Sequence, residues 1–127
     1  CTAPHGIEHP ISGLLNVAHG EGLAAIYPEY MRFMRPHAQA DFAELARLLG
    51  AETSGLTEEE ASLCAVEQVD ALLKTLGIAF TLSDLGVEES QLDWLARTAL
   101  DSMPAVFANN PIMMTFDDVK AILERRL

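Results

Sequence analysis

The sequence predicts an all-α fold, a multi-helix bundle that forms a single domain over residues 1–127. Half of the residues are hydrophobic and few are aromatic, a composition typical of a packed helical domain and not of a disordered chain. Apolar residues recur at helical spacing through most of the chain. Residues 78–82 contain the β-favouring Phe80 and Thr81, but no second run of this kind could pair with them. We therefore predict an extended connection there.

Residues 1–17 predict two short helices separated by Pro10. Thr2 is suited to cap the first helix, and Pro4 to occupy its first turn. Pro10 lacks the amide hydrogen that a continuing helix needs, so we expect it to kink or end that helix. A second helix is expected over residues 11–17, followed by a turn around His19.

Proline and glycine also delimit the next two predicted helices. Apolar side chains repeat at helical spacing over residues 21–34, where Pro28 is expected to bend the segment. Pro36 is expected to start another helix. Gly50 ends it, because glycine readily adopts the left-handed conformation that follows a helix. Residues 51–56 are predicted to form a loop.

Capping residues mark the helices of the second half of the chain. Thr57 and Glu60 have the spacing of a capping box, and the helix that they open is expected to end at Gly77. Another helix is expected from residue 88 to about residue 103, and Thr115 is expected to cap a final one. The residues predicted to face inward from these three helices are Ala65, Val69, Leu72, Leu73, Leu76, Leu92, Leu95, Ala96, Ala99, Val119, Ile122 and Leu123.

Three of the four histidines lie within residues 5–19, and they are the candidate metal-binding and catalytic residues. His5 and His9 are four residues apart, so on a helix they share one face. His19 follows an apolar stretch, and its side chain is expected to return to this pair from a neighbouring segment. Neutral imidazole is a common metal ligand. On spacing alone, three unrelated histidines are the alternative, because no cysteine cluster or local carboxylate completes a ligand set.

The residues around these histidines, with two later segments, form a recognisable pattern. They are His5-Gly6-Ile7-Glu8-His9-Pro10, His19-Gly20-Glu21-Gly22-Leu23-Ala24 with Pro28, Gly77-Ile78, Leu82-Ser83-Asp84-Leu85-Gly86, and Asn110-Pro111 with Thr115. This pattern, including the spacing of fourteen between His5 and His19, resembles the iron-containing (group III) alcohol dehydrogenases. The resemblance covers almost the whole chain but only the C-terminal third of a typical member, its helical metal-binding domain. Ala18 departs from the pattern, which usually has proline there.

The resemblance implies a role for each histidine. His5 and His19 would ligate a catalytic divalent metal, Fe²⁺ or Zn²⁺, and His9 would be the catalytic residue beside the substrate and the nicotinamide. The metal would polarise the oxygen of a small alcohol while hydride passes to NAD or NADP, giving the aldehyde.

The resemblance also implies parts that residues 1–127 do not contain. The family supplies two further metal ligands and an α/β nucleotide-binding domain from sequence upstream of such a stretch. No glycine-rich phosphate loop follows a strand here. We therefore expect this chain alone to bind the metal weakly or not at all, to bind no NAD(P), and to be inactive in hydride transfer.

Two other functions fit parts of the sequence. The run His5-x-x-Glu8-His9 matches the H-x-x-E-H motif of a class of zinc peptidases, a short motif that Pro10 would disturb and that leaves His19 unexplained. The other alternative is a stand-alone helical binding or interaction module with a relic dehydrogenase motif. Because the chain begins at Cys1, immediately before the motif, we expect it to be part of something longer, but nothing within it separates a dehydrogenase fragment from such a module.

Charge, hydropathy and cysteine content limit the partners. The net charge of −11 argues against nucleic acid, because a phosphate backbone needs a basic surface. No apolar run approaches the roughly 18 residues of a membrane-spanning helix, so no membrane partner is expected. The two cysteines, Cys1 and Cys64, make no disulfide framework and favour a reduced, cytoplasmic setting.

The segment from residue 7 to residue 33 is apolar on more than one side. Large exposed apolar patches tend to be covered by association, so we predict a symmetric homodimer through this segment. The alternative is that the other helices of the same chain bury it. Its apolar residues are Ile7, Ile11, Leu14, Leu15, Leu23, Ile26, Tyr27, Tyr30 and Phe33.

Overall fold

The computed structural model describes all of residues 1–127 and contains seven α-helices and no β-strand, so the all-α prediction is confirmed. The α-helices are α1 (Ala3–Leu15), α2 (His19–Met34), α3 (Gln39–Leu48), α4 (Glu58–Thr75), α5 (Leu92–Ser102), α6 (Pro104–Ala108) and α7 (Phe116–Arg125). Two short 3₁₀ helices, η1 (Arg35–His37) and η2 (Glu89–Gln91), lie between them. None of the helices has both the length and the hydropathy needed to cross a membrane.

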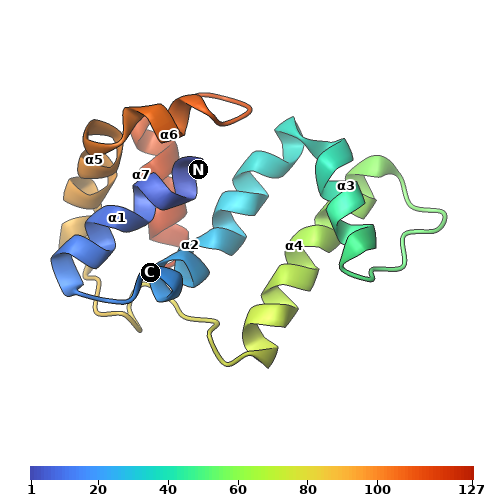
Figure 1. The fold of residues 1–127 in the computed structure, drawn as a ribbon, viewed down its shortest axis with the longest axis horizontal. Coiled ribbons are helices and arrows are strands. Elements are labelled where there is room, and N and C mark those ends of the chain that lie inside the picture. The colour runs from blue at the N-terminus through green and yellow to red at the C-terminus, as the bar shows by residue number, and fades with distance from the viewer.

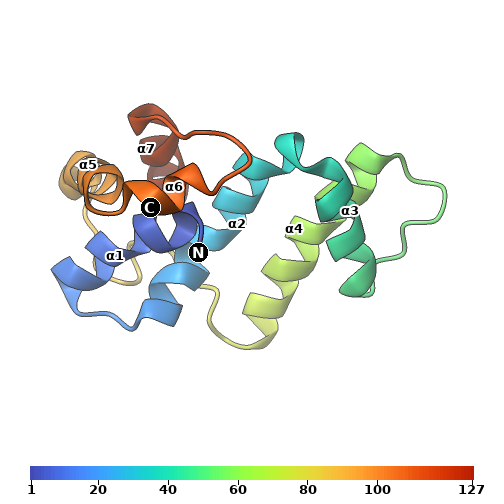
Figure 2. The ribbon, with the colours of Figure 1, turned by 45° about the horizontal axis from the view of Figure 1, so that its top comes forward.

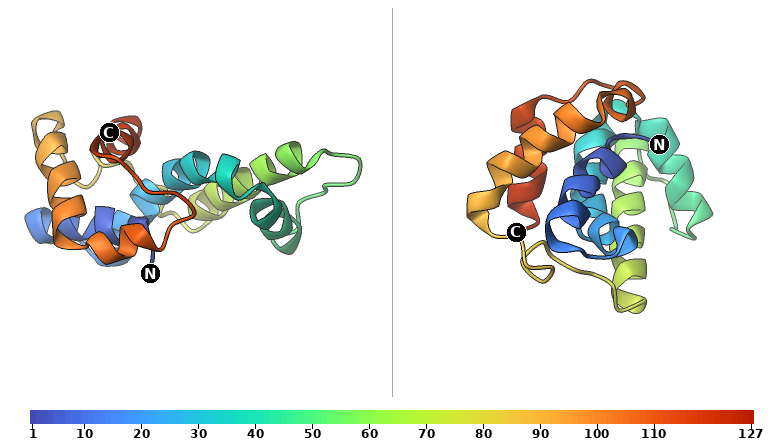
Figure 3. Two further views of the ribbon diagram at one scale, coloured as in Figure 1. Left: turned by 90° about the horizontal axis from the view of Figure 1, so that it is seen from above. Right: turned by 60° about the vertical axis from the view of Figure 1, so that its left-hand side comes forward.

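Helix α2 lies between two groups of helices. Figure 1 and Figure 2 show α1, α5, α6 and α7 on one side of it and the hairpin of α3 and α4 on the other. Seen from above, the hairpin extends away from the rest of the molecule (Figure 3). Nineteen buried residues form a main core between α1, α2, α5, α6 and α7. A separate small core consists of Met31, Ala46, Ala65 and Val66, where α2 meets the hairpin.

Helix α1 runs through Pro10, so the predicted division of residues 1–17 into two helices is wrong. Pro10 is buried, and its neighbours Ile7 and Ile11 are fully buried in the main core. Burying each isoleucine stabilises the fold by about 1.5–3 kcal/mol, which together offsets the roughly 3 kcal/mol cost of a proline inside a helix. The helix ends at Asn16, which has a left-handed conformation (φ 54°). His19 is therefore not in a turn but is the first residue of α2.

The capping residues predicted at Thr57 and Thr115 are confirmed, whereas Thr2 occupies the N-cap position of α1 without a side-chain hydrogen bond to the helix. The amide of Glu60 donates to Thr57 Oγ1 (3.2 Å), and the amide of Thr57 donates back to the Glu60 carboxylate (2.8 Å). This backbone hydrogen bond from Thr57 holds the pKa of the Glu60 carboxyl below its ordinary value. Thr115 makes the same pair of bonds with Asp118 at the start of α7. Gly77 follows α4 with a positive φ of 71°, as the predicted helix end requires.

Three details of the second half differ from the predictions. Helix α5 begins at Leu92 because the preceding residues Glu89–Gln91 form a 3₁₀ turn. The short helix α6 was not predicted. Leu72 on α4 and Leu76, the residue after its end, are 47% and 60% exposed and do not face inward. Residues 78–82 form the predicted extended connection, without a strand partner.

The segment from residue 7 to residue 33 is mostly buried, so the prediction of a bare apolar surface is wrong for its central residues. Ile7, Ile11 and Ile26 are fully buried in the main core. Of the large apolar residues in this segment, only Leu14 and Tyr27 are exposed, at 40% and 38%. The other helices of the same chain cover the segment. A homodimer through it remains a prediction, with a much smaller apolar surface to support it.

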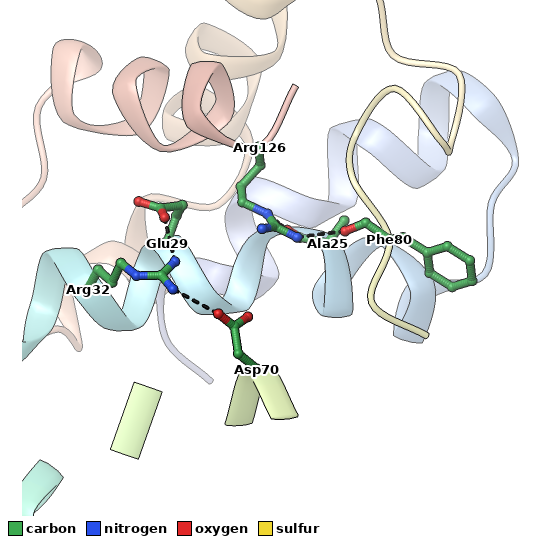
Figure 4. Close-up of polar contacts among 6 residues, drawn as sticks. All are labelled: Ala25, Glu29, Arg32, Asp70, Phe80 and Arg126. Carbon is green, nitrogen blue, oxygen red and sulfur yellow. Dashed lines mark hydrogen bonds and ion pairs between the residues drawn. The ribbon is translucent and has the colours of Figure 1, made fainter. Parts of the chain in front are cut away.

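Two arginines connect parts of the chain that are distant in sequence (Figure 4). The guanidinium of Arg32 on α2 contacts the carboxylate of Asp70 on α4 at 2.8 Å and so joins α2 to the hairpin. The guanidinium of Arg126 donates to the backbone oxygen of Ala25 on α2 and to that of Phe80 (2.7 Å). The end of α7 and the extended connection are thereby held against α2, whose first turn carries His19.

Candidate metal centre

Helices α1 and α2 bring three histidines together. Nδ1 of His5 lies 3.0 Å from Nε2 of His19. The ring centroid of His9 lies 5.1 Å from that of His19, in an edge-on arrangement. The predicted convergence is confirmed, and the three histidines are not unrelated. The fourth histidine, His37, is exposed on η1 and is not in the cluster.

The spacing of the two facing nitrogens suits a shared metal ion. Two imidazole nitrogens that each lie about 2.1 Å from one ion, at a right angle, are about 3.0 Å apart. The observed distance between His5 Nδ1 and His19 Nε2 is 3.0 Å, at which the two rings also hydrogen-bond to one another. The side chain of His19 is 43% exposed, so further ligands could reach an ion from outside. The residues present therefore fit two positions of a coordination sphere.

A buried carboxylate lies behind His19. Glu8 is fully buried, with one carboxylate oxygen against Nδ1 of His19 and the other accepting a hydrogen bond from the Ser12 hydroxyl. Burial of an unpartnered carboxylate is strongly unfavourable, and these two contacts provide its partners. Sequence reasoning considered Glu8 only as a peptidase base and missed this position. The usable signal was its spacing of four from Ser12, which places both side chains on one face of α1.

A second grouping of possible ligand atoms combines Glu8 and His9 with His19. One donor atom from each of Glu8, His9 and His19 lies within 4.8 Å of the others. His5 is not a member of this grouping, and Nε2 of His19 is the nitrogen that faces His5. Because Nδ1 of His19 already contacts Glu8, Nε2 is the ring nitrogen that is left to bind an ion, and it lies beside His5.

Gly22 on α2 provides the space for the Glu8 carboxylate. A Cβ atom at this position would lie 2.5 Å from Glu8 Oε1 and 2.7 Å from its Cγ. Both distances are well inside van der Waals contact, and Glu8 has no solvent-filled space to move into because it is fully buried. The absence of a side chain at Gly22 is therefore a requirement of the buried carboxylate.

We expect Gly22→Ala to lower the free energy of unfolding by about 1–2 kcal/mol. Overpacking costs about 1–3 kcal/mol, and alanine returns at most about 1 kcal/mol as a better helix former. The matched control is Gly20→Ala, in the same turn, where nothing lies within 4 Å of the added Cβ. Urea unfolding followed by circular dichroism measures both variants. Equal stability of the two variants would contradict the crowding at Glu8.

A cavity of about 350 Å³ opens beside His9, between α1 and α5. Trp94 on α5 lines it and is 51% exposed. The remaining lining residues are Pro10, Gly13, Thr98, Ser102 and Met103. The side chain of His9 thus contacts the ring of His19 and also lines a space large enough for a small molecule.

Comparison with known proteins identifies the family. The model of the Fe-containing alcohol dehydrogenase family, C-terminal part, matches residues 1–127. The chain belongs to the iron-containing alcohol dehydrogenase family. Within this family, lactaldehyde reductase of Escherichia coli K12 is 34% identical over 115 residues, which cover 91% of this chain and 30% of that protein. Long-chain-alcohol dehydrogenase 1 of Geobacillus thermodenitrificans NG80-2 is 32% identical over 120 residues, or 94% of this chain and 30% of that protein.

Solved structures of iron-containing alcohol dehydrogenases share the fold. The crystal structure of 1,3-propanediol oxidoreductase matches with a TM-score of 0.94 at 27% identity, over 99% of this chain and 32% of that one. NADH-dependent butanol dehydrogenase A of Thermotoga maritima matches with a TM-score of 0.85 at 28% identity, over 98% and 32%. The chain spans about 30% of the length of the curated relatives that it matches. Its helices therefore correspond to the C-terminal portion of the family.

Proposed function

We propose that this chain forms the metal-binding part of an NAD(P)-linked dehydrogenase that interconverts small alcohols and aldehydes. His5 and His19 are the metal ligands that it contributes, and His9 is the catalytic residue. The observation that supports this assignment most directly is the 3.0 Å separation of the facing nitrogens of His5 and His19, in a chain of this family. A divalent cation supplies Lewis acidity at the substrate oxygen, and a nicotinamide accepts the hydride.

The three histidines have different tasks in this proposal. His5 and His19 hold their nitrogens toward a common point from two different helices, which fixes the place where the substrate oxygen binds. His9 lines the adjacent cavity, where its imidazole can position a hydroxyl and carry its proton toward solvent. A volume of about 350 Å³ is at the lower end of small-molecule sites, which suits a small alcohol or aldehyde.

The metal assignment is tested with the 127-residue chain itself. We expect zinc to bind weakly, because two imidazoles leave most of the coordination sphere to water. Binding is expected to shift the ring nitrogen signals of His5 and His19 in ¹⁵N NMR spectra of histidine-labelled protein. His19→Ala is expected to weaken zinc binding by at least about tenfold. Removing a residue that only hydrogen-bonds to a metal ligand already lowers metal affinity by about this much, and removing the ligand itself should lower it no less.

The matched control for the zinc titration is His37→Ala, which removes the exposed histidine outside the cluster. This variant is expected to bind zinc as the unaltered chain does. Tight zinc binding that survives His19→Ala would contradict the assignment of His19. A titration that moves neither ring would favour the alternative of a helical module with a relic motif.

The peptidase alternative is disfavoured by the position of Glu8. A peptidase base has to reach a water molecule at the metal, but the Glu8 carboxylate is fully buried and contacts Ser12 and His19. A dependence on Glu8 and His9 for peptide cleavage in the presence of zinc would restore this alternative. A cytoplasmic location and a homodimer remain predictions from the sequence.

A further inference from the structure

We propose that Glu8 is a positioning residue that fixes the ring orientation and the tautomer of His19, so that Nε2 is left free to bind the metal. This inference rests on the proposed role of His19 as a ligand. It assigns a function to the one carboxylate in the cluster, which is not among the predicted ligands or catalytic residues. Three features of the structure carry it: the contact at Nδ1, the burial of the carboxylate, and the space that Gly22 leaves.

The contact at Nδ1 determines which nitrogen carries the hydrogen. An ionised carboxylate only accepts hydrogen bonds, so the Glu8 oxygen beside Nδ1 requires a hydrogen on that nitrogen. In a neutral imidazole the other nitrogen, Nε2, then keeps its lone pair. Nε2 is the nitrogen that lies 3.0 Å from His5. Metal-ligating histidines commonly donate their second N–H to a carboxylate in this way, which also raises the basicity of the ligating nitrogen.

Burial restricts the carboxylate to this role. Glu8 is fully buried and does not line the cavity beside His9, and its second oxygen accepts the hydrogen bond from Ser12. Ser12 lies one helical turn further along α1, so this contact keeps the side chain pointed at α2. The ring of His19 is 43% exposed, and Glu8 is the buried group that holds its Nδ1 side. Glu8 is thus buried between α1 and α2, and from there it holds the ring of His19, whose Nε2 is the proposed ligand atom.

The missing side chain at Gly22 on α2 leaves the space that the Glu8 carboxylate occupies. Gly22 lies three residues after His19, and a Cβ there would clash with Oε1, Cγ and Cδ of Glu8. Any other residue at this position would push the carboxylate away from Nδ1. The contact between Glu8 and His19 therefore also depends on Ser12 of α1 and on Gly22 of α2.

The metal-free 127-residue chain, labelled with ¹⁵N-histidine, provides the direct test. In the unaltered chain we expect long-range ¹H–¹⁵N spectra to show His19 with its hydrogen on Nδ1. Glu8→Met, which has similar length but offers no carboxylate, is expected to lose this preference. Zinc affinity, measured from the shifts of the His5 and His19 rings, is expected to weaken by about 10- to 100-fold. Glu8→Gln keeps an acceptor oxygen and is expected to restore the tautomer and most of the affinity.

Circular dichroism spectra establish that each variant is folded, so that loss of affinity reports on His19 and not on unfolding. If Glu8→Met does not fold, the spectrum of the unaltered chain and that of Glu8→Gln still decide. A hydrogen on Nε2 of His19 in the unaltered chain would overturn the proposal, and so would unchanged zinc affinity in a folded Glu8→Met. If zinc shifts neither ring in the unaltered chain, the metal assignment fails, while the tautomer of His19 still tests the contact with Glu8.

Discussion

Replacing His9 by alanine, in the natural protein that carries this chain, is expected to lower kcat for alcohol oxidation by about 10²- to 10⁴-fold. The imidazole lies beside the cavity and within 5.1 Å, centroid to centroid, of the ring of His19. From this position it can exchange a proton with a hydroxyl held near the metal ligands. Steady-state formation of reduced nicotinamide, measured at saturating alcohol and dinucleotide, gives kcat directly.

The metal content of the His9→Ala protein separates a catalytic role from a ligand role. We expect the variant to retain its metal, because His5 and His19 are unaltered. Loss of the metal would show instead that His9 belongs to the grouping with Glu8, and would contradict the proposal. His37→Ala serves as the matched control and is expected to leave kcat unchanged.

Truncating Phe107 to alanine is expected to lower the free energy of unfolding by about 3–5 kcal/mol. The ring is 1% exposed and is one of the largest side chains in the main core. It belongs to α6 and packs against α1 at Gly6, so its removal leaves a cavity between two helices that cannot readily collapse. Urea unfolding monitored by circular dichroism measures the loss. Leu48→Ala, at a residue 76% exposed, is the control and is expected to change stability by less than about 0.5 kcal/mol.

Gly6 offers an independent check on the packing of Phe107. A Cβ at Gly6 would lie 2.7 Å from Cε2 of Phe107 and 2.8 Å from Cγ2 of Val106. Gly6→Ala should therefore destabilise the unaltered chain, and should destabilise it less when Phe107 is already alanine. Residues in direct contact show such non-additivity, whereas distant ones do not. Additive losses would mean that the ring does not press on α1.

The elements that could be predicted from the sequence are those whose determinants are local. The caps at Thr57 and Thr115 act on amides three residues away, so a short window contains all the required information. The behaviour of Pro10 was mispredicted for the opposite reason. Its local effect is to interrupt a helix, but the main core holds the residues on either side of it. Burial by distant helices decided the outcome, and that burial is not visible in a window around Pro10.

The residues of the candidate site also differ in whether the sequence could predict their positions. The spacing of His5, His9 and His19 indicated a shared site, and the three side chains do converge. The position of Glu8 could not be obtained from spacing, because it depends on how closely α2 approaches α1 at Gly22. A glutamate in an amphipathic helix is usually solvated, and only the packing of the two helices shows that this one is enclosed.

The separation of the main core from the small core has a consequence for internal motion. The small core has only four buried residues, so the hairpin of α3 and α4 can detach from α2 at a lower free energy than global unfolding. Such an opening leaves Ala25 and Ile26 in place, because these residues of α2 belong to the main core. Helix α2 is therefore expected to keep its place in the main core while the hairpin is transiently released. His19, the first residue of α2, lies at the opposite end of this helix from Met31, the α2 residue of the small core.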